Sequence, residues 1–315
     1  MKRTEIHLIL ILVTFFTALF SRNLFAQELI FYSIPPISSL DWSSPRALLF
    51  DSAIGNHLTF SLAKSKHVIG HVFIELKSQS GERLLAGATG APDAPTDSDF
   101  ILKEGLGLGL FYANFKGALD DPESLKRQIE ERFKSGKISF MVFKLSLKTF
   151  DRLVYYLKEY HKRGYDKIYN GLCRPREGLG AGCTSFGMSF LEVGGLTRKE
   201  FVDNWQIHLK LPLDLIGGPI TRKKVSVWQV IKENRWGKDG ESVLPLDLYD
   251  PDLICKWIQK SWDQENFSRT QKDSTSNLSK LYGNVKLEKC GKALGLAFDC
   301  QEIPTPDEPV FLKEK

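Results

Sequence analysis

The sequence predicts an α+β fold, and three segments carry that prediction. Residues 67–76 (HVIGHVFIEL) are rich in β-branched and aromatic residues, as strands are. Residues 149–163 (TFDRLVYYLKEYHKR) repeat apolar residues along one helical stripe. Residues 183–195 (CTSFGMSFLEVGG) indicate a short, nearly all-apolar helix closed by two glycines. A helix without a polar face is expected to be buried.

The first 26 residues have the layout of a secretory signal peptide. Lys2 and Arg3 precede an apolar run from about His7 to Phe20, and Ala26 offers a small residue for cleavage. The run is about 14 residues long, short of the roughly 20 that span a bilayer, so an uncleaved anchor is the second interpretation. We therefore expect a periplasmic or secreted protein with no integral membrane span once the signal is removed near Ala26.

Composition and length exclude only a few classes of protein. The chain is 42% hydrophobic and 26% charged, and its formal net charge is +5 at pH 7. This balance gives no argument for a nucleic-acid partner or an anionic membrane surface. The length after cleavage suits one large domain, or one domain with an appendage, because single cores stop growing near about 250–300 residues.

The chain has five cysteines, and export makes disulfides permissible. An odd number leaves at least one thiol over. Cys290 and Cys300 flank a short glycine-containing segment, so we expect a disulfide bond between them, with Cys173 and Cys255 as a second candidate pair. That assignment leaves Cys183 free. The competing pairing joins Cys173 to Cys183 across the glycine-rich loop and would abolish any chemistry at Cys183.

Between the N-terminal extended segment (27–46) and residue 147, strands and one helix are expected around a long irregular region. The strand at 67–76 turns through KSQSGER into LLAGATG, which indicates a hairpin. Within the glycine-rich residues 87–119, EGLGLGLF (104–111) lacks the ending of a phosphate loop, so we interpret it as a flexible strand or lid. Asp121-Pro122-Glu123 predicts the start of a 14-residue helix, and 137–147 a buried strand.

The C-terminal third is predicted to be an extension, 213–315, packed on a domain that spans 47–212. It is expected to contain a strand at 224–231, a helix in PDLICKWIQKSW, a polar linker near 263–281 and a loosely held tail. The cations of Arg222-Lys223-Lys224 are interpreted as a solvated edge.

Cys183 is the candidate nucleophile. A helix N-terminus carries partial positive charge and free N–H groups, which stabilise the thiolate that attacks. The glycines at 180 and 182 let the backbone approach a substrate closely, and the Cys183 N–H can hold the oxyanion of a tetrahedral intermediate.

His71 is the candidate general base for that thiol. It lies in the middle of the strongest strand, directly after Gly70, and shares one strand face with Phe73 and Glu75. His67 and His71 have the spacing of a helical metal pair, but four residues of strand span about 13 Å. We therefore predict no metal site and no cofactor.

The order of these residues brings in a resemblance. GHVFIEL is followed by GCTSFGMSFLEV, in which Cys183 comes 112 positions after His71. This pair of segments resembles the circularly permuted papain-like cysteine hydrolases, which include NlpC-like envelope enzymes and lecithin retinol acyltransferase-like proteins. The match covers about residues 65–195. It implies an antiparallel sheet packed against the helix that bears the cysteine, with Cys183 as nucleophile and His71 as general base.

The sequence departs from that family at the third catalytic position. The family usually has a polar or acidic residue on the strand after the histidine, where it orients the imidazole, and here that place falls near Gly87. Thr89 and Glu75 are the available substitutes. An imidazole without such a partner is a weaker base, because its tautomer is not fixed.

Together these expectations describe an exported cysteine hydrolase or acyltransferase. It would cleave an amide or ester bond of a cell-envelope peptide or lipid through a thioacyl-enzyme. The alternative is a non-catalytic secreted binding or structural protein that keeps the fold, with Cys183 buried or disulfide-bonded. A redox protein is a third class, and the absence of a Cys-x-x-Cys pair counts against it.

Overall fold

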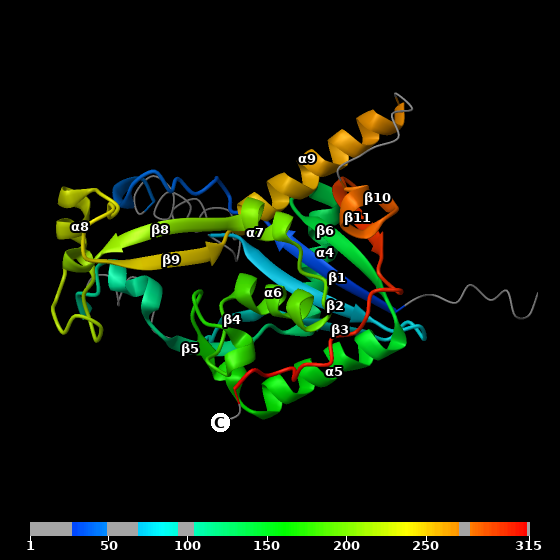
Figure 1. Ribbon diagram of the computed structural model, residues 1–315, viewed down its shortest axis with the longest axis horizontal. Helices are drawn as coiled ribbons and strands as arrows, with labels where there is room; N and C mark the ends of the chain where they lie inside the picture. Colours follow the sequence, from blue (N-terminus) through cyan, green and yellow to red (C-terminus); the bar gives the residue numbers. More distant parts are fainter. Residues whose placement is uncertain (1–26, 49–68, 94–103, 271–277, 314–315) are drawn as a thin grey trace, which may run out of the picture.

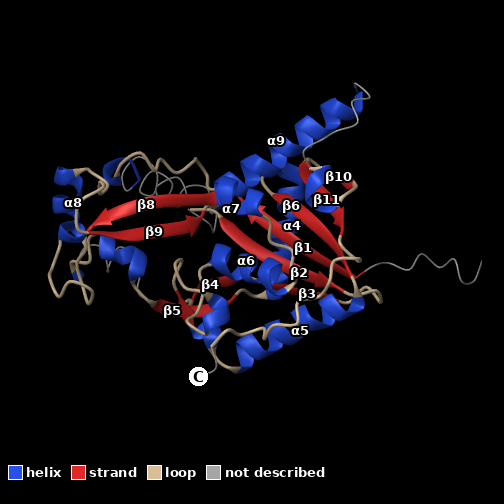
Figure 2. Ribbon diagram, in the orientation of Figure 1, coloured by secondary structure: helices blue, strands red, loops and turns tan. Residues whose placement is uncertain are grey.

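The computed structural model describes residues 27–48, 69–93, 104–270 and 278–313. The predicted signal peptide lies outside the described residues, as does His67. The described residues form an α+β structure in which helices cover a six-stranded sheet, as the sequence predicts in outline (Figures 1 and 2). No helix in this part of the chain is both long enough and apolar enough to cross a bilayer.

The six-stranded sheet has the order β10-β11-β6-β1-β2-β3. Neighbouring strands are antiparallel except β11 and β6, which are parallel. The strands are β1 (Gln27–Ile34), β2 (His71–Lys77), β3 (Arg83–Ala86), β6 (Ser139–Leu145), β10 (Val285–Cys290) and β11 (Ala293–Asp299).

The sheet crosses both predicted domain boundaries. β1 was expected in an N-terminal segment outside the domain, yet it lies between β6 and β2, where Phe31 pairs with Met141 on one side and Ile74 on the other. β10 and β11 come from the predicted C-terminal extension and continue the same sheet. Segments 27–46 and 213–315 therefore supply strands to the core sheet, because their apolar strand faces are buried only there.

Two layers of helices cover the sheet. The face that carries Phe31 and Val72 packs against α5 (Leu147–Lys162), α6 (Cys183–Val193) and α9 (Pro251–Thr270). The opposite face, with Tyr32 and Phe73, packs against α4 (Pro122–Ser135). Phe186, Phe190 and Leu191 of α6 are all fully buried, which agrees with the expectation for an all-apolar helix.

The helix boundaries follow local signals in the sequence. Asp121 caps α4 by accepting the Ser124 N–H at 2.9 Å, and Gly136 ends the helix in the left-handed region, so this prediction is confirmed. α5 begins two residues before the predicted Thr149, because the Ser146 side chain is the cap and accepts the Thr149 N–H. α6 begins at Cys183, as predicted.

Three C-terminal expectations are wrong. Residues 227–233 form a helix, α8 (Val227–Glu233), because Ser226 caps it, where a strand was predicted. The predicted linker at 263–281 is helical up to Thr270 in α9, and 271–277 lie outside the described residues. The tail is firmly held, because Phe311 is buried and Arg176 hydrogen-bonds to the Pro309 and Val310 carbonyls.

Two smaller sheets lie beside the main one. β4 (Ala88–Gly90), β5 (Phe115–Leu119) and β7 (Ile168–Tyr169) form a three-stranded sheet next to α6. β8 (Gln206–Pro212) and β9 (Val243–Tyr249) form a two-stranded arm that leads away from the six-stranded sheet and carries α8 at its far end (Figure 1). The remaining helical segments are η3 (Leu108–Tyr112), η4 (Tyr165–Lys167), η5 (Pro175–Glu177), η6 (Leu213–Leu215), α7 (Lys199–Trp205) and α10 (Ser279–Tyr282).

Candidate active site

Cys183 and His71 meet where the start of α6 crosses the start of β2. Each is the first residue of its element, and their side chains share a hydrogen bond. α6 approaches the sheet closely at Gly187, where an added Cβ would lie 2.5 Å from Val72 Cγ1 and 3.0 Å from the Phe31 ring. The glycine therefore allows the close packing that brings the thiol to the imidazole. The two predicted site residues lie together.

Asp120 is the third member of this cluster, and the sequence reasoning missed it. Its Oδ2 lies 2.9 Å from His71 Nε2, and its backbone N–H donates to the Gly87 carbonyl at 2.8 Å. Asp120 follows β5 directly and precedes Asp121, which caps α4. The sequence carried one signal for Asp120. Two aspartates are adjacent at 120 and 121, and only one of them is needed to cap α4.

The contact with Asp120 determines which nitrogen of the His71 ring is available to Cys183. Because the carboxylate accepts a hydrogen bond from Nε2, the neutral ring carries its proton there, and Nδ1 is left for the Cys183 thiol. His71 is only 3% exposed and the Asp120 side chain 12%, so this pair is shielded from water. The geometry is that of a base oriented by a third group.

Gly87 makes room for Asp120. A Cβ at this position would lie 3.2 Å from His71 Nε2 and 2.9 Å from Phe73 Cβ, and it would collide with Asp120 Oδ2. Gly87, near which the family's third residue was expected, therefore lies next to both Asp120 and His71. The space there is filled by the carboxylate of Asp120, the residue after β5, because Gly87 has no side chain of its own.

Thr89 does not substitute for the third residue. The β2–β3 ladder ends with the pair Ile74 and Ala86, and the chain then turns away at Gly87 into β4, where Thr89 pairs with Ala118. Its expected position across the hairpin from His71 is wrong for that reason. Because the chain leaves the ladder at this point, the first residues of β2, which include His71, do not pair with β3. They are left open to α6 and Asp120.

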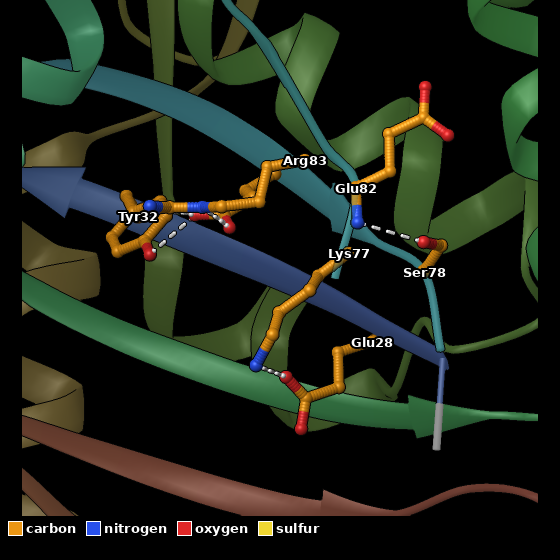
Figure 3. A network of polar contacts seen from close by, with 7 residues as sticks. Glu28, Tyr32, Lys77, Ser78, Glu82 and Arg83 are labelled. Atoms are coloured by element: carbon orange, nitrogen blue, oxygen red, sulfur yellow. Dashed lines mark hydrogen bonds and ion pairs between the residues drawn. The ribbon is translucent and has the colours of Figure 1, made fainter. Parts of the chain in front are cut away.

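Glu75 does not substitute either, because it is engaged elsewhere. It is 1% exposed and accepts hydrogen bonds from the Tyr32 hydroxyl and from Arg83 Nη2, both at 2.9 Å. Figure 3 shows Tyr32 and Arg83 side by side in this network, next to the separate ion pair of Lys77 with Glu28. Because this buried carboxylate is already paired with a guanidinium, it stabilises the sheet and does not orient the imidazole.

Tyr169 contacts the thiol from the side of β7. Its hydroxyl shares a hydrogen bond with Cys183. Burial, the negative charge of Cys183 and that hydrogen bond raise the pKa of Tyr169 well above 10, so the hydroxyl stays protonated and donates. No spacing pattern in the sequence pointed to Tyr169.

The surroundings favour an ion pair of thiolate and imidazolium. Burial alone lowers the pKa of His71, but hydrogen bonds to Asp120 and Cys183, with their charges, outweigh it and raise the pKa to about 9. Burial raises the pKa of Cys183, yet the hydrogen bond and charge of His71, the Val72 N–H and the Tyr169 hydroxyl lower it below its ordinary value. The Cys183 thiol is therefore more acidic than an ordinary cysteine thiol, which favours the reactive thiolate form.

The other cysteines differ from Cys183 in this respect. Burial raises the pKa of Cys173 to about 11 and that of Cys255 to about 12, so neither thiol is activated.

All five cysteines are free thiols, contrary to the expected disulfides. Cys290 pairs with Ala293 at the hairpin turn, whereas Cys300 follows the far end of β11. These ends lie about 24 Å apart, and a disulfide needs Cα atoms within about 7 Å.

Comparison of the chain with protein-family models, with curated proteins and with solved structures gave no match. Among the described residues, no group of three or more His, Cys, Asp or Glu side chains is placed to hold a metal ion. The residues that define the candidate site are therefore Cys183, His71, Asp120 and Tyr169.

Proposed function

We propose that the chain is a cysteine hydrolase or acyltransferase of the permuted papain-like kind, with Cys183 as nucleophile, His71 as base and acid, and Asp120 as the residue that orients the imidazole. The observation that carries the proposal is the contact of one thiol with one imidazole whose other nitrogen is bound by a carboxylate that is only 12% exposed. This chain order, strand histidine before helix-start cysteine, is the feature shared with that family.

The reaction follows from the geometry. The Cys183 thiolate attacks a carbonyl carbon, and the carbonyl oxygen becomes an oxyanion. N–H groups in the first turn of α6 lack helical partners and can hold that oxyanion next to the sulfur. The His71 Nδ1 proton passes to the leaving amine or alcohol, which departs and leaves a thioester on Cys183. His71 then takes a proton from water, or from an acceptor alcohol or amine, whose attack releases the acyl group and restores the thiol.

The substrate class follows from the proposed location. We place the protein in the periplasm or outside the cell, on the basis of the charged and apolar N-terminal residues. The bond cleaved is then an amide or ester of a cell-envelope peptide or lipid. N-terminal sequencing of the exported protein tests the location, since a mature chain that begins near Gln27 is expected and an intact Met1 contradicts cleavage.

A competing function is favoured by one observation. Cys183 is only 7% exposed, as expected for the core thiol of a non-catalytic binding or structural protein that retains the fold. The two functions differ in whether the sulfur reacts.

Acylation by p-nitrophenyl acetate tests the proposal directly. Rapid mixing is expected to give a burst of about one nitrophenolate per protein, with an added acetyl mass that peptide mapping places on Cys183. Cys183→Ser and His71→Ala are expected to lose the burst. Cys255→Ser serves as the matched control, because Cys255 is also buried but has a raised pKa, and it is expected to keep the burst. Acetylation spread over several cysteines, or a burst that survives His71→Ala, refutes the dyad.

A further inference from the structure

The end of the β8–β9 arm carries an exposed surface that combines cations with apolar side chains. Arg222, Lys223 and Lys224 are consecutive and all exposed. Ile220 is 46% exposed and Trp228, on the first turn of α8, is 70% exposed, the largest value among the big apolar side chains of the described residues. We call these five residues the arm tip.

No residue in the described part of the chain neutralises the three cations. Within the part of the chain that the structure describes, none of them is in an ion pair, whereas Lys210 and Arg235 on the same arm are paired with Asp239 and with Asp214 and Glu241. The arm tip therefore presents a local positive charge, although the net charge of the whole chain is small. The interpretation of these residues as an ordinary solvated edge accounts for the cations but not for the two exposed apolar side chains.

The loop that bears the arm tip packs closely against the glycine-rich segment 104–111. The Val225 N–H donates to the Gly105 carbonyl at 2.7 Å. A Cβ at Gly107 would lie 2.6 Å from Val225 Cγ1, and one at Gly109 would meet the Gly217 carbonyl. Glycines let these two segments pack backbone against backbone. EGLGLGLF therefore supports the loop, and its residues from Leu108 onward belong to the 3-10 helix η3 and do not form the expected strand.

The arm tip is separate from the candidate active site. The arm has its own apolar cluster, which includes Leu211, Ile216, Val225, Val230 and Leu246. Figure 1 shows α8 at the end of the arm that lies away from the six-stranded sheet. A contact made by the arm tip thus leaves Cys183 and His71 unobstructed.

We propose that the arm tip docks the protein on the surface of an anionic lipid bilayer. Cations near such a surface are attracted by its negative potential, while tryptophan and aliphatic side chains enter the boundary between headgroups and acyl chains. A nucleic acid or an anionic polysaccharide uses the charge equally well but gives no reason for exposing Ile220 beside Trp228. The intermixed apolar side chains therefore favour lipid.

Vesicle sedimentation tests this proposal with a matched pair of triple variants. The tip variant is Arg222→Gln with Lys223→Gln and Lys224→Gln. The control is Lys286→Gln with Lys289→Gln and Lys292→Gln, which removes the same charge from exposed, unpaired residues of the β10–β11 hairpin, a described part of the chain. All proteins compared share one N-terminus, so the apolar run at 7–20 contributes equally to each.

With vesicles that contain about one third phosphatidylglycerol, the unchanged protein is expected to bind, and to lose binding on pure phosphatidylcholine or at high salt. The tip variant is expected to bind about 10²-fold more weakly, at about fivefold for each cation, and the control to stay within about threefold. Trp228→Ser is expected to bind several-fold more weakly at each salt concentration at which the unchanged protein binds.

Three outcomes overturn the proposal: binding that ignores lipid charge, equal losses in the tip and control variants, or a preference for duplex DNA over vesicles that depends on the tip cations. Thermal melts of all variants show whether they fold, which these exposed positions are expected to permit. The rate of Cys183 alkylation is expected to be unchanged in the tip variant. Failure of the Cys183 chemistry leaves this test unaffected.

Discussion

Asp120 Oδ2 lies 2.9 Å from His71 Nε2, although 49 residues separate them in the chain. The Asp120 carboxylate comes from the end of β5, and the imidazole from the start of β2. Both are nearly excluded from solvent, so their hydrogen bond acts at low dielectric, where such a contact has a large effect on the pKa of the imidazole. The candidate site therefore depends on a pair that joins two separate sheets.

Asp120→Asn is expected to narrow the pH range of turnover. Asp120 helps to hold the pKa of His71 at about 9, so its removal lowers that pKa and moves the alkaline limit of activity to lower pH. A less charged imidazole also lowers the pKa of Cys183 less, which moves the acid limit to higher pH. Turnover at neutral pH is expected to fall by about 10²–10⁴-fold. A pH–rate profile checks this, and an unshifted alkaline limit contradicts the role of Asp120.

Gly87→Ala is expected to reproduce much of that loss. The added Cβ would collide with Asp120 Oδ2 and crowd His71 Nε2, so the carboxylate must move away from the ring. Gly90→Ala is the control, because nothing lies within 4 Å of a Cβ there and the position belongs to the same β4 region. Comparison of the two pH–rate profiles measures the effect. Equal activity in both variants shows that Asp120 is not held in place through Gly87.

Tyr169→Phe is expected to raise the pH at which Cys183 becomes reactive. The Tyr169 hydroxyl is one of the groups that lower the pKa of the Cys183 thiol, and phenylalanine removes that donor without removing the ring. The pH dependence of iodoacetamide alkylation at Cys183 gives the midpoint directly. Tyr155→Phe, at an exposed position of α5, is the control and is expected to leave the midpoint unchanged. A midpoint that does not rise in Tyr169→Phe excludes this hydroxyl as a thiolate donor.

Phe311→Ala is expected to lower the free energy of unfolding by about 3–5 kcal/mol, as for other buried aromatic side chains. Phe311 is 5% exposed, and its ring packs at 5.2 Å from that of Tyr156 and 5.3 Å from that of Tyr165. Leu312→Ala, at a residue that is 54% exposed, is expected to cost less than about 1 kcal/mol. Urea unfolding measures both. Similar values for the two variants mean that the tail is not part of the core.

Thiol counting without reductant is expected to find five free thiols in the denatured protein. No cysteine is paired in the structure, and Cys290 and Cys300 lie at opposite ends of their hairpin. Reaction with Ellman's reagent in guanidinium chloride provides the count. A count of three or one shows that disulfides form, and peptide mapping then tells whether Cys183 is among the paired residues.

The sequence was sufficient wherever the signal is local. The cap at Asp121, the apolar stripe of α5 and the glycines before Cys183 act within one turn of their own residues, and each gave an element that the structure contains. The sequence also allowed His71 and Cys183 to be selected as candidate site residues, because a cysteine at the start of a helix and a histidine in a strand can each be recognised from the residues around them. The sequence likewise predicted that α6 is buried.

Tertiary structure alone decided which residues surround the thiol. Asp120 and Tyr169 come from strands whose pairing depends on where the chain leaves the β2–β3 ladder, and no local pattern fixes that point. The place of β1 in the centre of the sheet, and of β10 and β11 at its edge, likewise depends on burial of apolar strand faces that are far apart in sequence. Local signals fix where an element begins and ends, whereas long-range packing fixes its neighbours, and the third residue of the proposed site is such a neighbour.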